Sequence, residues 1–188
     1  MSEHALSGPS ISHLVLNVRD IEASHRFYTE ALGFQQCGSI AEGSRIGVMR
    51  FYRANPEAHH ELALVQTKEE SVDPETWSIL ATRIGINHIA LNYGNRENFL
   101  ARLEHLRKVD VEFLNRGNHG MTHSLYVQDP DGNGIEVLYD VPSSAWQDDV
   151  NAALNYYETL RLDGSESLQD STDYKRFEAN ETSVVFSA

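Results

Sequence analysis

Cysteine is almost absent from this sequence, with Cys37 the only one among 188 residues. An internal disulfide is therefore impossible, which favours a reducing compartment, and we expect a cytoplasmic protein. Long apolar runs are missing too, since none approaches the ~18 residues that a membrane-spanning helix needs. Residues 1–10 have neither the basic start nor the apolar core of a signal peptide. These absences predict a protein with no membrane partner.

Basic residues are scarce relative to acidic ones, with 15 Lys and Arg against 28 Asp and Glu, and the net charge is -13. A chain this acidic is repelled by phosphate backbones, so we expect no nucleic-acid partner. The 40% of hydrophobic and 23% of charged residues are typical of a globular protein, and 188 residues suit a single domain. Nine histidines are many, so their positions must separate ligands from ordinary surface groups.

Two stretches of the chain show the same order of expected elements. The first runs from about residue 10 to 67: an alternating strand, a helix that Asp20 caps and Gly33 ends, and three further strands. The second runs from about 85 to 141 and repeats this order, with Asn95 as the helix cap. The expected strands are 11–18, 34–37, 46–53 and 61–66, then 86–93, 111–114, 123–128 and 135–139. The prediction is an α+β fold of two βαβββ modules that form a half-open eight-stranded barrel around a metal.

A common offset of 75 residues supports an internal duplication. His88 lies 75 positions after His13, and Glu136 lies 75 positions after Glu61. Residues 11–16 also align with residues 86–91 without a gap. Chance similarity of apolar positions would not place two functional residue types at one offset.

The chain changes character after the second module. Ser143 or Ser144 is a candidate cap for a helix that continues to about Leu160, with apolar residues at helical spacing. We therefore expect a helical extension over about 142–188 that packs on the sheet.

Three residues form a candidate metal site. Glu136 follows a turn over 129–132 and sits in an apolar strand, where a lone carboxylate is costly unless it is paired or bound to a metal. His13 and His88 occupy equivalent places in the first strands of the two modules. Two imidazoles and one carboxylate form the facial triad suited to non-haem Fe(II) and O2 chemistry, with Mn(II) as the alternative metal.

These features resemble a known family. The two modules, His13, His88, Tyr126 and the segment Asp129-Pro-Asp-Gly-Asn-Gly-Ile-Glu136 are similar to the vicinal oxygen chelate superfamily, and within it to small type I extradiol catechol dioxygenases. The resemblance covers about residues 10–141. It implies a ring-cleaving enzyme of aromatic-compound degradation, with a catechol and O2 as its small-molecule partners, and a homo-oligomer.

The resemblance also implies three catalytic residues. His60, before the last strand of the first module, corresponds to the acid/base histidine of extradiol enzymes. His119, in a His-Gly segment, corresponds to a histidine that bonds the bound oxygens, and Tyr126, ten residues before Glu136, to a tyrosine that contacts the catecholate. A histidine has a suitable pKa for moving a proton near neutral pH.

Glu61 leaves two alternatives open. Because successive strand residues point to opposite faces, strict symmetry would aim Glu61 at the metal and His60 away from it. His13, Glu61, His88 and Glu136 would then be the ligands of a glyoxalase-like isomerase on Ni²⁺ or Zn²⁺. A bulge or turn before Glu61 would instead rotate His60 inward. A non-enzymatic drug-binding module of the same fold is the third reading, but such a module does not need metal ligands.

Overall fold

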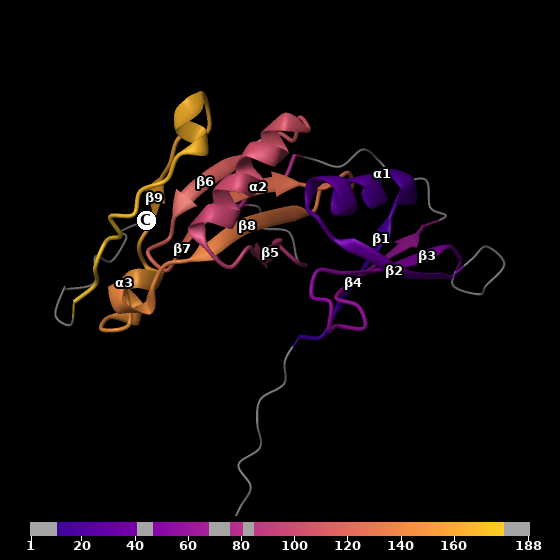
Figure 1. Cartoon of the computed structure of the whole chain (residues 1–188), viewed down its shortest axis with the longest axis horizontal. Coiled ribbons are helices and arrows are strands. Elements are labelled where there is room, and N and C mark those ends of the chain that lie inside the picture. Colours follow the sequence, from indigo (N-terminus) through magenta and orange to yellow (C-terminus); the bar gives the residue numbers. More distant parts are fainter. Residues whose placement is uncertain (1–10, 41–46, 68–75, 81–84, 179–188) are drawn as a thin grey trace, which may run out of the picture. The chain divides into compact units, whose positions relative to one another are not determined.

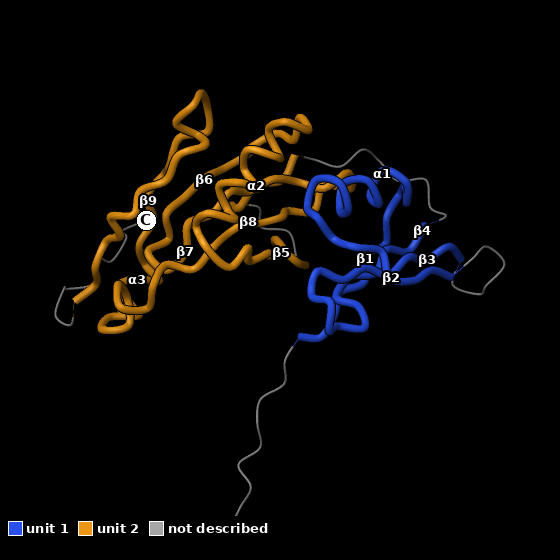
Figure 2. Tube along the Cα trace, in the orientation of Figure 1, with its two compact units in different colours: residues 1–72 blue, residues 73–188 orange. Residues whose placement is uncertain are grey.

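The computed structural model describes residues 11–40, 47–67, 76–80 and 85–178. The chain divides into two compact units, residues 1–72 and 73–188, and each contains one predicted module (Figure 2). Residues 1–10, where we expect no signal peptide, and the start of the predicted strand 46–53 lie outside the described residues. The single-domain organisation of the whole chain stays a prediction.

The first unit has the predicted βαβββ order (Figure 1). Its elements are β1 (Leu14–Val18), α1 (Ile21–Arg26), which continues as a π-helical segment (Phe27–Ala31), β2 (Gln35–Ile40), β3 (Met49–Arg53) and β4 (Leu62–Gln66). The strand order is β1-β4-β3-β2, in which β1 and β4 are parallel and the other neighbours antiparallel. The Asp20 side chain accepts the first free N–H groups of the helix, and Gly33, at φ +86°, follows its end. The predicted helix cap at Asp20 and the predicted helix end at Gly33 are therefore confirmed.

The second unit repeats this order and adds a strand. Its elements are β5 (His88–Asn92), α2 (Arg96–Lys108), β6 (Asn115–Asn118), β7 (Thr122–Gln128), β8 (Gly134–Asp140) and β9 (Glu158–Thr159). The strand order is β5-β8-β7-β6-β9. Asn95 caps α2, whose buried face consists of Phe99, Leu103 and Leu106. The α+β fold with two βαβββ modules is confirmed, and both sheets remain open.

The register of the strands corrects the repeat at one position. Val15 pairs with Ala63 in the first unit, and Ala90, which lies 75 residues after Val15, pairs with Glu136 in the second. The register counterpart of Glu136 is therefore Ala63, and the predicted equivalence of Glu61 and Glu136 is wrong. The 75-residue offset describes the first strands of the modules but not the last ones.

Strand β6 lies later in the chain than the sequence predicts. The β-prone segment 111–114 is irregular, and the polar segment Asn115-Arg-Gly-Asn118 forms the strand instead. The strand forms at this later segment because its backbone pairs with β7 on one side and with β9 on the other. Neighbouring strands thus override the weak intrinsic preference of these residues.

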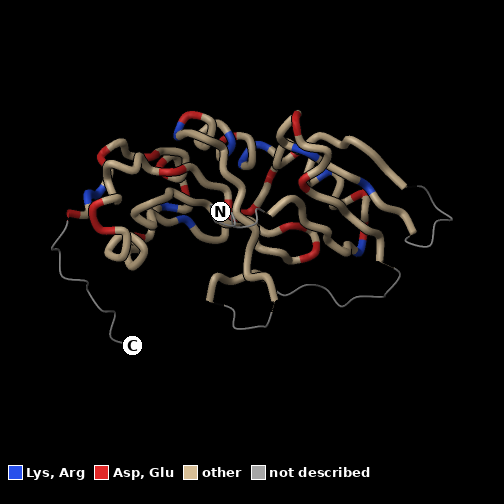
Figure 3. Tube along the Cα trace, turned by 90° about the horizontal axis from the view of Figure 1, so that it is seen from below, with Lys and Arg blue, Asp and Glu red and all other residues tan. Residues whose placement is uncertain are grey.

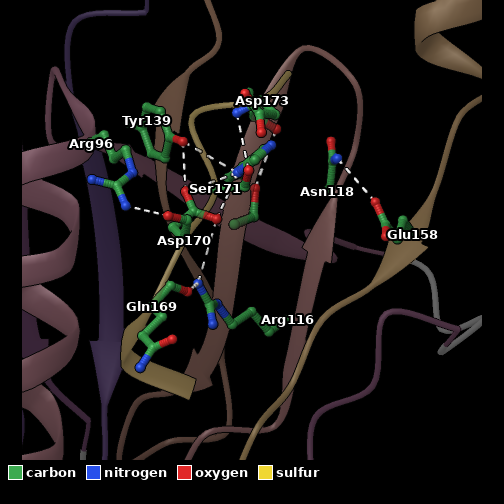
Figure 4. Close-up of polar contacts among 12 residues, drawn as sticks. Arg96, Arg116, Asn118, Tyr139, Glu158, Gln169, Asp170, Ser171 and Asp173 are labelled. Carbon is green, nitrogen blue, oxygen red and sulfur yellow. Dashed lines mark hydrogen bonds and ion pairs between the residues drawn. The ribbon is translucent and has the colours of Figure 1, made fainter. Parts of the chain in front are cut away.

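A buried polar cluster attaches the C-terminal segment to the second sheet (Figure 4). Arg116, only 1% exposed, donates hydrogen bonds to three carbonyl oxygens of this segment. Asp170 accepts a hydrogen bond from the Tyr139 hydroxyl at 2.6 Å, and its carboxylate lies 2.9 Å from His123 Nδ1. Burial alone would raise the pKa of Asp170, but these hydrogen bonds hold it below its ordinary value.

The single helix predicted over 143–160 is wrong. The extension consists of a 3-10 turn (Ser143–Ala145), a short helix α3 (Val150–Leu154) and β9. The 3-10 turn ends at Trp146, whose Nε1–H donates to the Val141 carbonyl at 3.0 Å, and Asp149 caps a new helix start. Backbone pairing of β9 with β6 then favours strand geometry at Glu158.

Charge does not separate the two units. Figure 3 shows acidic and basic residues interspersed along the traces of both. In the part of the chain that the structure describes, no helix is long and apolar enough to cross a membrane.

Candidate metal and dioxygen site

The second unit brings His88 and Glu136 together on one face of its sheet. In the parallel pair of β5 and β8, His88 is opposite Gly134 and Ala90 is opposite Glu136. The side chains of His88 and Glu136 therefore point to the same face of the sheet. His88 Nε2 lies 3.2 Å from Glu136 Oε2. Two donor atoms bound at right angles to one cation, with bonds of about 2.1 Å, are about 3 Å apart. This pair therefore fits two adjacent positions of a metal.

Hydrogen bonds orient both side chains. His88 Nδ1 lies 2.8 Å from Asn87 Oδ1, and since an amide oxygen only accepts, Nδ1 is the donor in this contact and Nε2 is the atom that faces Glu136. Glu136 is 6% exposed, and its Oε1 accepts the Tyr126 hydroxyl at 2.9 Å. One carboxylate oxygen is thus held by the protein, while the other faces His88.

Tyr126 connects Glu136 to His119. Tyr126 on β7 is the direct cross-strand neighbour of Glu136, and its hydroxyl oxygen lies 3.0 Å from His119 Nε2. The hydroxyl gives its single hydrogen to Glu136, so His119 must be the donor to Tyr126. Burial, together with the adjacent Glu136 carboxylate, raises the pKa of Tyr126, and burial lowers the pKa of His119.

The first unit brings His13 and His60 together. His13 directly precedes β1, His60 lies two residues before β4, and their ring centroids are 4.5 Å apart. His60 also contacts the edge of Phe51, at 5.1 Å between centroids, and its Nδ1 lies 2.7 Å from His59 Nδ1. Partial removal from water and the neighbouring histidines lower the pKa of His60.

Glu61 has a different role in this unit. Its Oε2 accepts the backbone N–H groups of Ala54 and Asn55 at 2.8 and 2.7 Å, which caps the turn between β3 and β4. The strand β4 starts only at Leu62, so His60 and Glu61 lie in the bend before it and strand alternation does not apply to them.

The predicted ligands are shared between the units. His13 belongs to the first and His88 and Glu136 to the second, and among the described residues of either unit alone no three His, Cys, Asp or Glu side chains form a metal-binding group. Four predicted residues, His88, Glu136, Tyr126 and His119, form one chain of contacts, with 2.9–3.2 Å between successive polar atoms. The complete three-ligand site stays a prediction.

Trp77 also contacts Tyr126 in this chain of contacts, although the sequence does not predict it. Its indole stacks on the Tyr126 ring, with 5.2 Å between centroids and 14° between planes. In the sequence, Trp77 belongs to an isolated, mainly apolar segment, Trp77-Ser-Ile-Leu80, which follows a polar connector. Neither periodicity nor spacing tells which strand such a segment contacts.

Replacing Gly134 by alanine is expected to destabilise the protein by about 1–3 kcal/mol, because overpacking in a filled interior forces neighbours to move. A Cβ at Gly134 would lie 2.0 Å from Trp77 Nε1. Thermal denaturation of the variant should show a lowered midpoint. Gly38→Ala is the matched control, since its Cβ would meet nothing closer than Phe51 at 3.6 Å. Equal midpoints for the two variants would contradict this placement of Trp77.

The chain matches the Glyoxalase/Bleomycin resistance protein/Dioxygenase superfamily over residues 10–137. It is 30% identical over 173 residues to Catechol-2,3-dioxygenase of Bacillus subtilis (strain 168), covering 88% of this chain and 53% of that protein. It is also 30% identical over 149 residues to Biphenyl-2,3-diol 1,2-dioxygenase 2 of Rhodococcus globerulus, covering 78% of this chain and 70% of that protein. The chain thus spans about half the length of the Bacillus relative.

A solved structure shares the fold. The glyoxylase/bleomycin resistance protein/dioxygenase domain from Frankia sp. EAN1pec aligns with a TM-score of 0.58 and 21% identity, covering 73% of this chain and 100% of that one. Because the family match includes both modules and the observed topology agrees with it, this chain belongs to the glyoxalase/bleomycin resistance/dioxygenase superfamily, the vicinal oxygen chelate superfamily.

Proposed function

We propose that this protein is an extradiol dioxygenase, which opens the ring of a catechol-type diol with O2 at a non-haem Fe(II) centre in aromatic-compound degradation. The contact chain from His88 through Glu136 and Tyr126 to His119 carries this proposal. It places two candidate ligands beside a phenol and an imidazole that can contact a substrate. The names of the two relatives above, both diol dioxygenases, support the same activity.

His13, His88 and Glu136 would hold the metal, with Mn(II) as the alternative to Fe(II). When bound, such a cation lowers the pKa of the catechol oxygens and supplies the redox centre for O2. The protein contributes orientation: Asn87 fixes the His88 ring, and Tyr126 holds the second oxygen of Glu136. The other carboxylate oxygen, Oε2, faces His88 and would be the one to bind the cation.

The remaining site residues have separate roles in this proposal. The Tyr126 hydroxyl, kept protonated by its raised pKa, can donate to a substrate oxygen in place of Glu136. His119 donates from Nε2 and keeps the phenol oriented. His60, whose Nδ1 is beside His59, can take up and return a proton at Nε2.

The glyoxalase-like isomerase would need Glu61 as its fourth ligand. The Glu61 carboxylate accepts two backbone N–H groups, and ligation would require it to leave them. Lost hydrogen bonds to a charged group cost about 1.5–3 kcal/mol each. This contact favours the dioxygenase. A small-molecule diol and O2 are the proposed partners, and the homo-oligomer and the cytoplasmic location stay predictions.

Catechol turnover is the direct test. The protein, loaded anaerobically with Fe(II), is expected to consume O2 with catechol, methylcatechols or biphenyl-2,3-diol and to form a yellow ring-opened product, because an extradiol product is a conjugated semialdehyde or keto acid. O2 uptake and visible absorbance measure this. Conversion of a hemithioacetal by the Ni²⁺ or Zn²⁺ form, with no O2 uptake from any diol, would instead establish the isomerase.

A further inference from the structure

We propose that Trp77 is a positioning residue of this site, one that fixes both the Tyr126 ring and the His88 imidazole; this inference rests on the proposed function. Trp77 is only 8% exposed, and its indole lies flat on the Tyr126 ring. The Tyr126 hydroxyl must point at Glu136 and His119 together. A stacked indole restricts rotation of the phenol about its side-chain bonds, so both contacts are kept.

A second path leads from the Trp77 segment to His88 through Asn87. The indole Nε1–H donates to the Asn87 carbonyl at 2.6 Å, and the Asn87 amide nitrogen donates to the Ile79 carbonyl at 3.3 Å. These two bonds fix the Asn87 backbone and the orientation of its amide. The amide oxygen is thereby turned to His88 Nδ1, so His88 Nε2 faces Glu136. The ring of His88 also lies edge-on to the indole, at 6.2 Å between centroids.

The indole itself is held in a fitted position. Gly134 of β8 provides the space, since any Cβ there would overlap the indole. The backbone N–H of Trp77 donates to Gln128 Oε1 at 2.8 Å, which ties this segment to the end of β7. Trp77 is therefore connected to the strands that carry His88, Tyr126 and Glu136. One residue outside the two predicted modules thus orients two of the proposed site residues, Tyr126 and His88.

Three variants separate these contacts. Trp77→Leu removes both the stack and the Nε1–H donor, whereas Trp77→Phe keeps an aromatic ring on Tyr126 but lacks the donor to Asn87. Trp146→Phe is the matched control, because this other tryptophan also donates its Nε1–H to a backbone carbonyl, that of Val141.

Histidine-ring NMR signals of the metal-free protein report these contacts without metal, catechol or O2. Trp77→Leu is expected to shift the ring signals of both His88 and His119, and Trp77→Phe to shift His88 while His119 stays near its wild-type position. Trp146→Phe is expected to move neither. If Trp77→Leu shifts these two histidines no more than Trp146→Phe does, or if Trp77→Phe shifts His119 as strongly as Trp77→Leu, the proposal is overturned.

Kinetics provide the second measurement when the wild type cleaves a catechol. Loss of a group that orients ligands and substrate-contacting residues typically costs about 10–100-fold. We expect this loss in kcat for Trp77→Leu, with KM changed less than about threefold, partial rescue in Trp77→Phe and wild-type kcat in Trp146→Phe. If Trp77 had only a structural role, Trp77→Phe would also lower the fraction of active protein. Its NMR spectrum would then not show a shift of His88 without a shift of His119. Absence of turnover in the wild type would refute the dioxygenase, while the NMR result would still decide the role of Trp77.

Discussion

Glu136→Ala is expected to abolish iron retention while the protein stays folded. The variant loses the only carboxylate ligand of the proposed triad, and Tyr126 loses the acceptor at 2.9 Å. Removing a group that merely orients a ligand weakens metal binding about 10–100-fold, so removing a ligand should weaken it by more than about 100-fold. His13→Ala and His88→Ala are expected to show the same loss. Iron per chain after gel filtration, beside a circular dichroism spectrum, measures ligation and folding separately.

Glu136→Gln is the control that separates ligation from packing. The amide has nearly the shape of the carboxylate and keeps an oxygen that accepts from Tyr126, but it carries no charge. We expect wild-type thermal stability within about 1 kcal/mol together with strongly reduced iron content, because the Tyr126 hydrogen bond is retained. Near-normal iron in any two of the three alanine variants would remove the proposed triad.

The module pattern could be predicted because its signals are local. Asp20 and Asn95 cap their helices by hydrogen bonds that span only a few residues, and the buried stripe of α2 follows from helical periodicity. His88 and Glu136 could be paired because each starts or occupies a short apolar strand of the same module. Such features need no knowledge of distant parts of the chain.

The missed features depend on distant partners. Arg116 is buried in β6 because carbonyl oxygens some fifty residues later accept hydrogen bonds from both of its terminal guanidinium nitrogens, and no local sequence pattern predicts these contacts. The position of Trp77 could not be predicted because its indole fits beside Gly134, where the absence of a side chain leaves the space. Glu61 does not follow the repeat symmetry because it precedes β4 and its side chain caps a turn. A constant sequence offset between two repeats thus identifies equivalent residues inside paired strands but not at the ends of the strands.

His60 and Glu61 are adjacent, and their alanine variants are expected to behave in opposite ways. His60→Ala should retain iron and still bind catechol, but lose turnover by about 10²–10⁴-fold, the usual contribution of a general acid or base. The reason is that the His60 ring lies beside the proposed ligand His13, with its Nδ1 near His59, and would transfer the proton through Nε2. His25→Ala is the matched control, a histidine of the same unit whose Nδ1 lies 3.1 Å from the Tyr52 hydroxyl, and it should keep full activity.

Glu61→Ala should lower stability rather than strip the metal. Its carboxylate caps the turn before β4 through Ala54 and Asn55, and losing a side-chain cap costs about 0.5–2 kcal/mol. A disturbed turn would also move the adjacent His60, so a tenfold to hundredfold loss of turnover is about the limit for such an indirect effect. Iron content and single-turnover rate of the two variants give four values. A metal-free Glu61→Ala beside a fully active His60→Ala would make Glu61 the fourth ligand and assign the site to an isomerase, because only a ligand controls metal retention in that way.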